Sequence, residues 1–235
     1  RSSDLRTDPT APKHRGISYF ICPMDQPGID IRPIREMSGG HHFNEVFFDG
    51  ARVPAANLVG APGDGWRLAR VTLGNERVSL SGGGALWGMG PDAYALFDIV
   101  RERGGVTDPV RRQELASLYI EAEILRLIRL RTVSAAIKGE APGPEASIRK
   151  LLADEHGQKI MGLAKDLVGT GAMLTGEGPM GAPVDMWHFG YLFARALTIG
   201  GGTTQVQRNI LAERVLGLPH DIDPHEGRPW TESRR

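Results

Sequence analysis

The sequence predicts an α+β fold that is mainly helical, in which a partial antiparallel β domain precedes an antiparallel four-helix-type bundle. Up to about residue 63, short apolar runs are separated by proline and glycine, which is typical of small antiparallel sheets. Beyond Gly65 the apolar residues recur at helical spacing. The 235 residues suffice for one large domain or two small ones. We therefore expect a β domain over residues 1–63, a bundle over 64–218 and a tail over 219–235.

Three apolar runs predict the strands of the β domain, at residues 17–21, 29–31 and 44–48. Pro33 and Gly39-Gly40 are typical of the breaks between them. Residues 1–15 predict a loop that enters the first strand. Because so small a sheet would leave open edges, we expect further sequence of the same protein to precede residue 1.

Apolar-periodic stretches predict the helices of the bundle, at residues 64–80 with a continuation past Gly82–Gly84 to residue 102, and at 109–138, 144–169, 184–199 and 203–217. Pro144 suits a helix start, and Gly139 and Gly169 suit helix ends. The tail has few apolar residues to bury, so it predicts an arm or a disordered segment.

Charge and cysteine content exclude several classes of function. Lysine and arginine total 28 and aspartate and glutamate total 28, so there is no electrostatic reason to bind nucleic acid. The single cysteine, Cys22, cannot form an internal disulfide and has the setting of a small buried side chain. No apolar run approaches the ~18 residues of a membrane helix. We expect a cytoplasmic protein with no nucleic-acid partner and no membrane span.

Histidine and arginine groups have structural interpretations. His41 and His42 would point to opposite faces of a strand, and no cysteine or carboxylate cluster completes a metal site, so we expect no metal. The arginines at 126–131 border an apolar helix face, where we expect them to be solvated or paired with residues such as Glu121 and Glu123.

The first candidate cluster is Leu73-Gly74-Asn75-Glu76-Arg77, shortly after Gly65-Trp66. Glu76 lies in a mainly apolar helix, and Arg77 is not its natural partner because adjacent helical residues do not face one another. From the residues alone, this carboxylate is either an acid or base or a solvated or structurally paired charge.

The second candidate cluster is Gly200-Gly201-Gly202-Thr203, which continues to Ile210. Three glycines before a helix start allow backbone N–H groups to approach a ligand closely, and Thr203 is suited to capping that start. A phosphate, a ribityl chain or a carbonyl oxygen would fit there, although glycines also end helices for purely structural reasons.

Taken in order, these clusters closely resemble the acyl-CoA dehydrogenase family. The resemblance covers about residues 5–219, which correspond to the later part of that family's middle β domain and its whole C-terminal bundle. The matching segments are Gly16-Ile17-Ser18 with Phe20, residues 43–54 with 57–60, Gly65-Trp66, Glu76-Arg77, Gly201-Gly202-Thr203, residues 207–210 and residues 212–219.

The resemblance implies an FAD-dependent enzyme that forms dimers or tetramers and oxidises acyl-CoA thioesters to 2,3-enoyl-CoA. In that family a carboxylate removes the α proton, the β hydrogen leaves as hydride to flavin N5, and N–H donors stabilise the developing enolate at the thioester oxygen. Electron-transfer flavoprotein is the electron acceptor that this family implies.

The base is the first point where this sequence departs from the family pattern. Many members place a glutamate where this chain has Gly201, which cannot accept a proton. Other members place it on the first bundle helix before an arginine, the position of Glu76 before Arg77. The resemblance therefore implies Glu76 as base, while Gly201 still offers its backbone N–H to the thioester oxygen.

Flavin-binding motifs form the second departure. A family Arg-x-x-Phe-Gly motif is replaced by Arg101-Glu102-Arg103-Gly104-Gly105, and a glutamine-glycine-glycine region by residues 166–171, where only Gly169 is carried over. The family's amino-terminal helical domain and the front of its β domain form the third departure, because they have no counterpart here. We therefore expect the chain to be a fragment of a longer enzyme.

The resemblance also implies the remaining contacts of the site. Gly202, Thr203 and Gln205, with Gly169, would lie at the flavin. The residues implied at the acyl-CoA are Leu73, Asn75, Arg77 and Gly200.

Two alternatives to this dehydrogenase remain open. A non-catalytic partner subunit of a heteromeric dehydrogenase would keep the fold and bind no flavin productively, which the altered flavin motifs favour. A same-fold flavin oxidase or hydroxylase would use oxygen to reoxidise its flavin.

Overall fold

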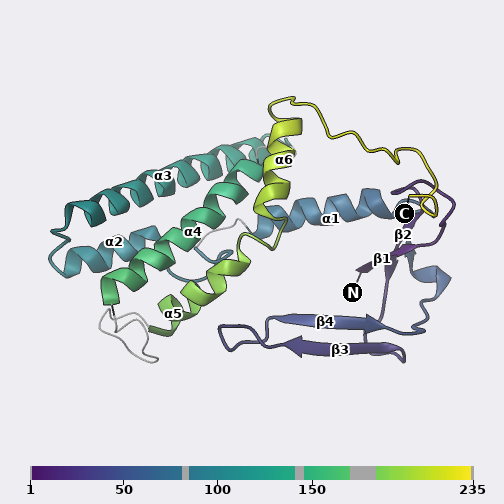
Figure 1. Cartoon of the computed structure of the whole chain (residues 1–235), viewed down its shortest axis with the longest axis horizontal. Coiled ribbons are helices and arrows are strands. Elements are labelled where there is room, and N and C mark those ends of the chain that lie inside the picture. Colours follow the sequence, from purple (N-terminus) through teal and green to yellow (C-terminus); the bar gives the residue numbers. More distant parts are fainter. Residues whose placement is uncertain (1, 81–84, 141–145, 170–183, 234–235) are drawn as a thin grey trace. The chain divides into compact units, whose positions relative to one another are not determined.

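The computed structural model describes residues 2–80, 85–140, 146–169 and 184–233. The chain divides into two compact units, which we call the β unit (Arg1–Asn75 with His220–Arg235) and the helical unit (Glu76–Pro219). The β unit is built on antiparallel strands and the helical unit on long helices (Figure 1). The predicted α+β, mainly helical architecture is therefore confirmed.

The β unit contains two small antiparallel sheets. The first has the order β1-β2-β5, with β1 (Ser2–Arg6), β2 (Ile17–Ile21) and β5 (Leu58–Val59). The second pairs β3 (Ile29–Ile34) with β4 (Phe43–Phe48), in a register that sets Ile31 opposite Val46. A short 3₁₀ helix, η1 (Ala55–Asn57), precedes β5.

Two expectations for this unit were wrong. Residues 2–6 form a strand rather than part of a loop, because Leu5 and its polar neighbours pair with β2, and a strand of mixed polarity gives no apolar run in the sequence. Pro33 lies inside β3 opposite Asn44 instead of ending the strand. Since β3 is an edge strand of a two-stranded sheet, the missing N–H of a proline is tolerated there.

The tail packs as an arm against the start of the chain within the β unit. The Trp230 N–H donates to the Ala11 carbonyl at 3.2 Å, and the Arg6 guanidinium lies 4.2 Å from the centre of the Trp230 ring. Lys13 pairs with Asp223 at 3.3 Å. Of the two predicted alternatives, the structure shows the arm.

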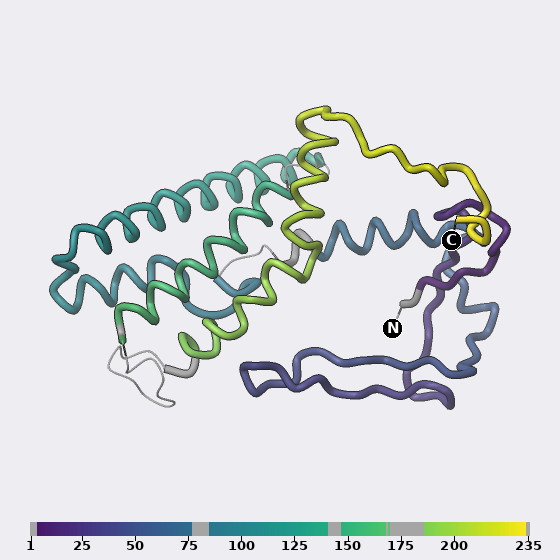
Figure 2. Tube along the Cα trace, in the orientation of Figure 1, coloured from purple at the N-terminus to yellow at the C-terminus, as the bar shows by residue number. Residues whose placement is uncertain are grey.

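Helices account for most of the helical unit. They are α2 (Ala93–Glu102), α3 (Pro109–Ile137), α4 (Ala146–Val168), α5 (Val184–Phe193) with the 3₁₀ turn η3 (Ala194–Ala196), and α6 (Thr204–Arg214), while α1 (Gly65–Leu80) spans the division between the units. Helix α4 packs against α3, α5 and α6 (Figure 2).

The predicted continuation of the first helix to residue 102 was wrong. Residues 85–92 are not helical, and Trp87 has a φ of 51°, which a right-handed helix cannot contain. Asp92 then starts α2, because its carboxylate accepts the N–H of Ala95 at 3.0 Å. The expected Gly82–Gly84 passage lies outside the described residues. The last two predicted helices end earlier than expected, at Phe193 and Arg214.

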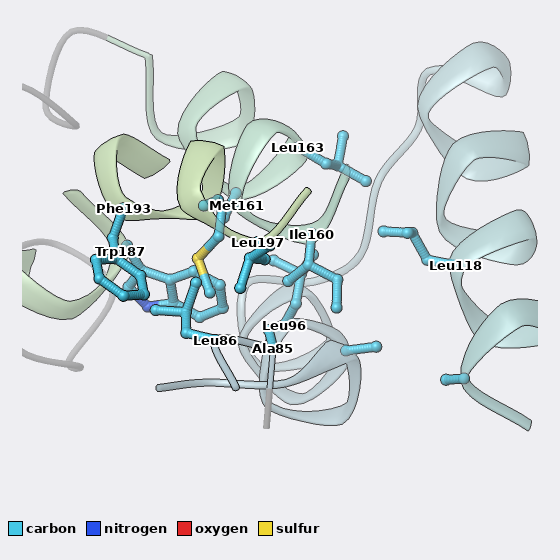
Figure 3. Packing of buried hydrophobic residues seen from close by; sticks show 14 residues of the cluster. Ala85, Leu86, Leu96, Leu118, Ile160, Met161, Leu163, Trp187, Phe193 and Leu197 are labelled. Carbon is cyan, nitrogen blue, oxygen red and sulfur yellow. The ribbon is translucent and has the colours of Figure 1, made fainter. Parts of the chain in front are cut away.

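The core of the helical unit forms around the middle of α4. Ile160 and Met161 of α4 are buried with Leu86, Leu96 of α2 and Leu197 after η3 (Figure 3). Close packing requires a glycine here: a Cβ on Gly157 would lie 2.2 Å from the carbonyl oxygen of Ala85. Ala85 therefore packs directly against the backbone of α4 at Gly157.

We predict that Gly157→Ala lowers the free energy of unfolding by about 1–3 kcal/mol, since the new methyl group meets backbone that cannot turn aside. Gly162→Ala on the same helix is the matched control, because its Cβ would have no neighbour within 4 Å. The control should gain up to about 1 kcal/mol from helix propensity. Urea unfolding followed by circular dichroism measures both changes, and equal stabilities for the two variants would contradict the packing.

Candidate functional site

The second candidate cluster forms a tight loop between η3 and α6, which we call the glycine loop (residues 197–203). Gly201 has a φ of 65° and Gly202 a φ of 93°, a region that side-chain-bearing residues rarely adopt. A Cβ on Gly200 would lie 2.5 Å from the Trp87 ring. Each glycine is therefore required by backbone conformation or by close approach.

The glycine loop leads directly into the amino terminus of α6. The Thr203 hydroxyl accepts the N–H of Val206 at 3.3 Å, so the predicted cap is confirmed. Gln205, in the first turn, is exposed. The partial positive charge and free N–H groups of a helix start suit an anionic or carbonyl oxygen.

A buried polar side chain of α4 binds the backbone of the glycine loop. The Lys150 ammonium of α4 donates to the Gly202 carbonyl at 2.7 Å and to the Leu197 carbonyl at 3.1 Å. It also forms an ion pair with Asp154, one turn along α4, at 2.5 Å. Lys150 is 2% exposed and Asp154 is 3% exposed.

Gln207 supports the loop from α6. Its side-chain amide donates to the Gly201 carbonyl at 2.9 Å, and the residue is 1% exposed. Sequence reasoning missed Gln207, Lys150 and Asp154. A signal was available for the pair on α4: a lysine and an aspartate four residues apart, separated by Leu151-Leu152-Ala153, lie on one helix face.

Burial changes the proton affinity of Asp154. Desolvation raises the pKa of its carboxyl group to about 6, while the neighbouring Lys150 ammonium acts in the opposite direction. The Asp154 carboxyl group therefore takes up a proton at a higher pH than an ordinary aspartate does.

The first candidate cluster lies on α1. Leu73, Asn75 and Glu76 are all exposed, and Leu73 shares a helix face with Glu76 because they are three residues apart. Arg77 lies on the same helix, but its side chain is outside the described part of the chain. The predicted residues therefore lie in two clusters on separate elements, α1 and the glycine loop that precedes α6.

Gly169 directly follows α4 and has a φ of 64°, the conformation of a helix-ending glycine. The other altered positions of that motif, Thr170 and Gly171, are outside the described residues. Gly169 therefore has a structural explanation, and its place at a flavin stays a prediction.

A cavity of about 190 Å³ lies beside the Lys150–Asp154 pair, between α2, α3 and α4. His156 lines it and bonds to Glu121 of α3 at 2.9 Å. Burial lowers the pKa of His156, although the bonded carboxylate opposes that shift. Arg126 also lines the cavity. It is one of the arginines expected to be solvated or paired, and it forms an ion pair with Glu123 at 2.8 Å.

Across the described residues, no group of three or more histidine, cysteine or acidic side chains is placed to hold a metal ion. None of the described helices is both long and apolar enough to cross a bilayer.

Comparison with known proteins identifies one family for most of this chain. The family model for the acyl-CoA dehydrogenase C-terminal domain matches residues 63–216. The acyl-CoA dehydrogenase IpdE1 of Mycobacterium tuberculosis is 40% identical over 217 residues, which are 92% of this chain and 54% of that protein. FadE34 of the same organism is 39% identical over 91% of this chain and 28% of its own length.

Solved structures agree. The Tcur3481-Tcur3483 steroid ACAD matches 93% of this chain and 56% of its own with a TM-score of 0.79 at 28% identity. The ChsE4-ChsE5 complex from Mycobacterium tuberculosis matches 93% of this chain and 57% of its own with a TM-score of 0.71 at 30% identity. The chain thus spans about half the length of most of the proteins it matches.

We predict that His156 contributes a loss of unfolding free energy as pH drops below about 6.5, the ordinary pKa of histidine, while the raised pKa of Asp154 contributes in the opposite direction. The unfolded chain then binds a proton that folded His156 resists, because burial holds the pKa of His156 below its ordinary value. Urea unfolding at pH 7.5 and pH 5.5 measures the loss, which should be smaller in His156→Gln. The exposed His220→Gln variant is the control, and an equal loss in all three proteins would contradict the assignment.

Proposed function

The chain belongs to the acyl-CoA dehydrogenase family, and we propose that it forms the later middle β domain (residues 1–63), the C-terminal bundle (64–218) and the tail (219–235) of an FAD-dependent acyl-CoA dehydrogenase. The reaction would be oxidation of an acyl-CoA thioester to the 2,3-enoyl-CoA. The observation that carries this proposal is the glycine loop, which has backbone conformations and close contacts that only glycine fits at the start of a capped helix.

The residues of the loop fit a flavin. Gly202 has a φ of 93°, a backbone conformation that favours glycine, so the chain turns sharply just before the helix start. We propose that Gly202, Thr203 and Gln205, with Gly169, hold FAD near the α6 helix start, which favours polar and anionic groups. When bound, FAD supplies the acceptor for the β hydrogen, which leaves as a hydride.

The chain's own residues would activate the thioester. The Gly201 N–H donates to the thioester oxygen and stabilises the negative charge that develops there in the transition state. With that charge stabilised, Glu76 removes the α proton as general base. Leu73, Asn75 and Arg77 on α1, with Gly200 in the loop, would contact the acyl-CoA.

The second part of the proposal concerns whether the assembly contains one kind of chain or two. Two of the matching structures are named as pairs of different chains, Tcur3481-Tcur3483 and ChsE4-ChsE5. This supports a heteromeric assembly, although a homo-oligomer stays open. It also supports the alternative that this chain is a partner subunit without catalysis, which the changed segments 101–105 and 166–171 favour.

Substrate, acceptor and location are inferred at a coarser level. One neighbour is described as a steroid ACAD, and glycine at the usual position of the base leaves space for branched or polycyclic acyl groups. We propose electron-transfer flavoprotein as acceptor and a cytoplasmic location. Reoxidation by oxygen would instead identify a same-fold oxidase or hydroxylase.

We predict that acyl-CoA thioesters bleach the visible flavin absorbance of the full-length protein under anaerobic conditions. Glu76→Gln should slow bleaching roughly 10²–10⁴-fold, the usual contribution of a general base. The control is Glu140→Gln, an exposed glutamate just after α3, which should bleach at the wild-type rate.

Each other result selects an alternative. Absence of bound flavin would support the non-catalytic partner subunit. Flavin that thioesters never bleach, and that other substrates reduce, would support an oxidase or hydroxylase. Normal bleaching in Glu76→Gln would place the base elsewhere.

A further inference from the structure

Lys150 binds both ends of the turn that contains the three glycines. Its ammonium donates to the carbonyl of Leu197, before the glycines, and to the carbonyl of Gly202, at their end. Its ion pair with Asp154 accounts for a third partner. Two hydrogen bonds to carbonyl groups and one ion pair thus surround the buried ammonium.

The chemistry of this pair is unusual for a position needed only for packing. Lys150 and Asp154 are almost completely buried, and a buried ion pair seldom stabilises a protein more than apolar residues of similar volume. Apolar side chains at these positions would fill the same space but could not bind the two carbonyl groups. The pair is therefore explained by the loop that it holds.

The direction of the carbonyl groups fixes the direction of the N–H groups. Gly201 and Gly202 turn their carbonyls toward the buried Gln207 amide and Lys150 ammonium. In a trans peptide the C=O and N–H bonds point in opposite directions. The N–H groups that follow these carbonyls, on Gly202 and Thr203, therefore point away from the buried side chains. The Gly201 N–H, which we assign to the thioester oxygen, belongs to a residue between the two carbonyls that Lys150 binds, and the carbonyl of that residue is itself held by Gln207.

Glycines alone would not maintain this arrangement. Residues without a Cβ sample many backbone conformations, so a loop of three glycines loses more entropy on ordering than other sequences. Donors stabilise a transition state only when they are already oriented, and a displacement of 1 Å can cost about 10²-fold in rate.

We propose that Lys150, Asp154 and Gln207 are positioning residues that hold the glycine loop, and with it the Gly201 N–H that we assign to the thioester oxygen. This inference rests on the proposed function. Lys150 and Gln207 act through the carbonyl groups of Leu197, Gly201 and Gly202, and Asp154 acts through its ion pair with Lys150.

The first experiment tests the holding of the loop without any ligand. Hydrogen–deuterium exchange is measured on the full-length wild type, on Lys150→Met and on Lys159→Met. Lys159 is the matched control, because it lies on the same helix, is half exposed and pairs with Glu121. Lys150→Met should speed exchange in residues 197–206 at least about tenfold and the control should not. Unchanged exchange in Lys150→Met would overturn the proposal.

The second experiment tests orientation toward the thioester. The 2-enoyl-CoA product of the best wild-type substrate, labelled with ¹³C at its carbonyl, is bound to each variant, and its carbonyl stretch is recorded by difference infrared spectroscopy. Lys150→Met should move the band to higher frequency, because the carbonyl loses oriented donors, and should lower kcat about 10²-fold with a smaller change in KM. A merely structural role would leave the band of the bound fraction in place.

Gln207→Met leaves the Lys150–Asp154 ion pair intact. If Lys150→Met does not fold, this second variant tests whether the buried side chains position the glycine loop. It removes the donor to Gly201 and should give the same shift of the band in the same direction. A native band and native kcat in a folded Gln207→Met would overturn the proposal. If the wild type neither binds nor oxidises any thioester, the proposed function fails, and the exchange experiment alone still decides whether these side chains hold the loop.

Discussion

One buried ammonium group joins the two ends of the glycine loop to the bundle. Lys150 is buried near the start of α4, and its nitrogen contacts Asp154 and the carbonyls of Leu197 and Gly202. Without Asp154, a buried charge would be left uncompensated, which is far less favourable than its being paired. Without Lys150, two carbonyl groups of an interior turn would lose a donor. The shape of the glycine loop therefore depends on a polar group that the sequence places inside an apolar helix.

Helix α4 supplies both the core and the support of the site. Ile160 and Met161 pack into the centre of the helical unit (Figure 3). Lys150 and Asp154 lie about two to three turns earlier on the same helix. Gly157, between these groups, allows Ala85 to pack directly on the helix backbone. Because a helix is stiff over this length, the packing of Ile160 and Met161 in the core also fixes the position of the Lys150 ammonium relative to the glycine loop.

The sequence predicted the helical architecture more fully than the polar details. Periodicity and capping signals located α3 within one residue at its carboxyl end, and Thr203 was identified as a cap. The break at Trp87 was missed although Gly90-Pro91 is a local signal of a helix end. Only the positive φ of Trp87 itself depends on tertiary packing. β1 was missed because a polar edge strand has no apolar period.

The site was predicted unevenly for a physical reason. Glycine clusters and a carboxylate before an arginine are local patterns, so Gly201 and Glu76 could be selected from sequence. The roles of Lys150 and Gln207 depend on which carbonyls lie nearby, and those lie up to 52 residues away along the chain. The most direct measurement of the central claim is a crystal structure of the full-length protein with FAD and a non-oxidisable acyl-CoA analogue. We expect the thioester oxygen within about 3 Å of the Gly201 nitrogen, with the Glu76 carboxylate facing the α carbon. A thioester oxygen bound away from the glycine loop would contradict it.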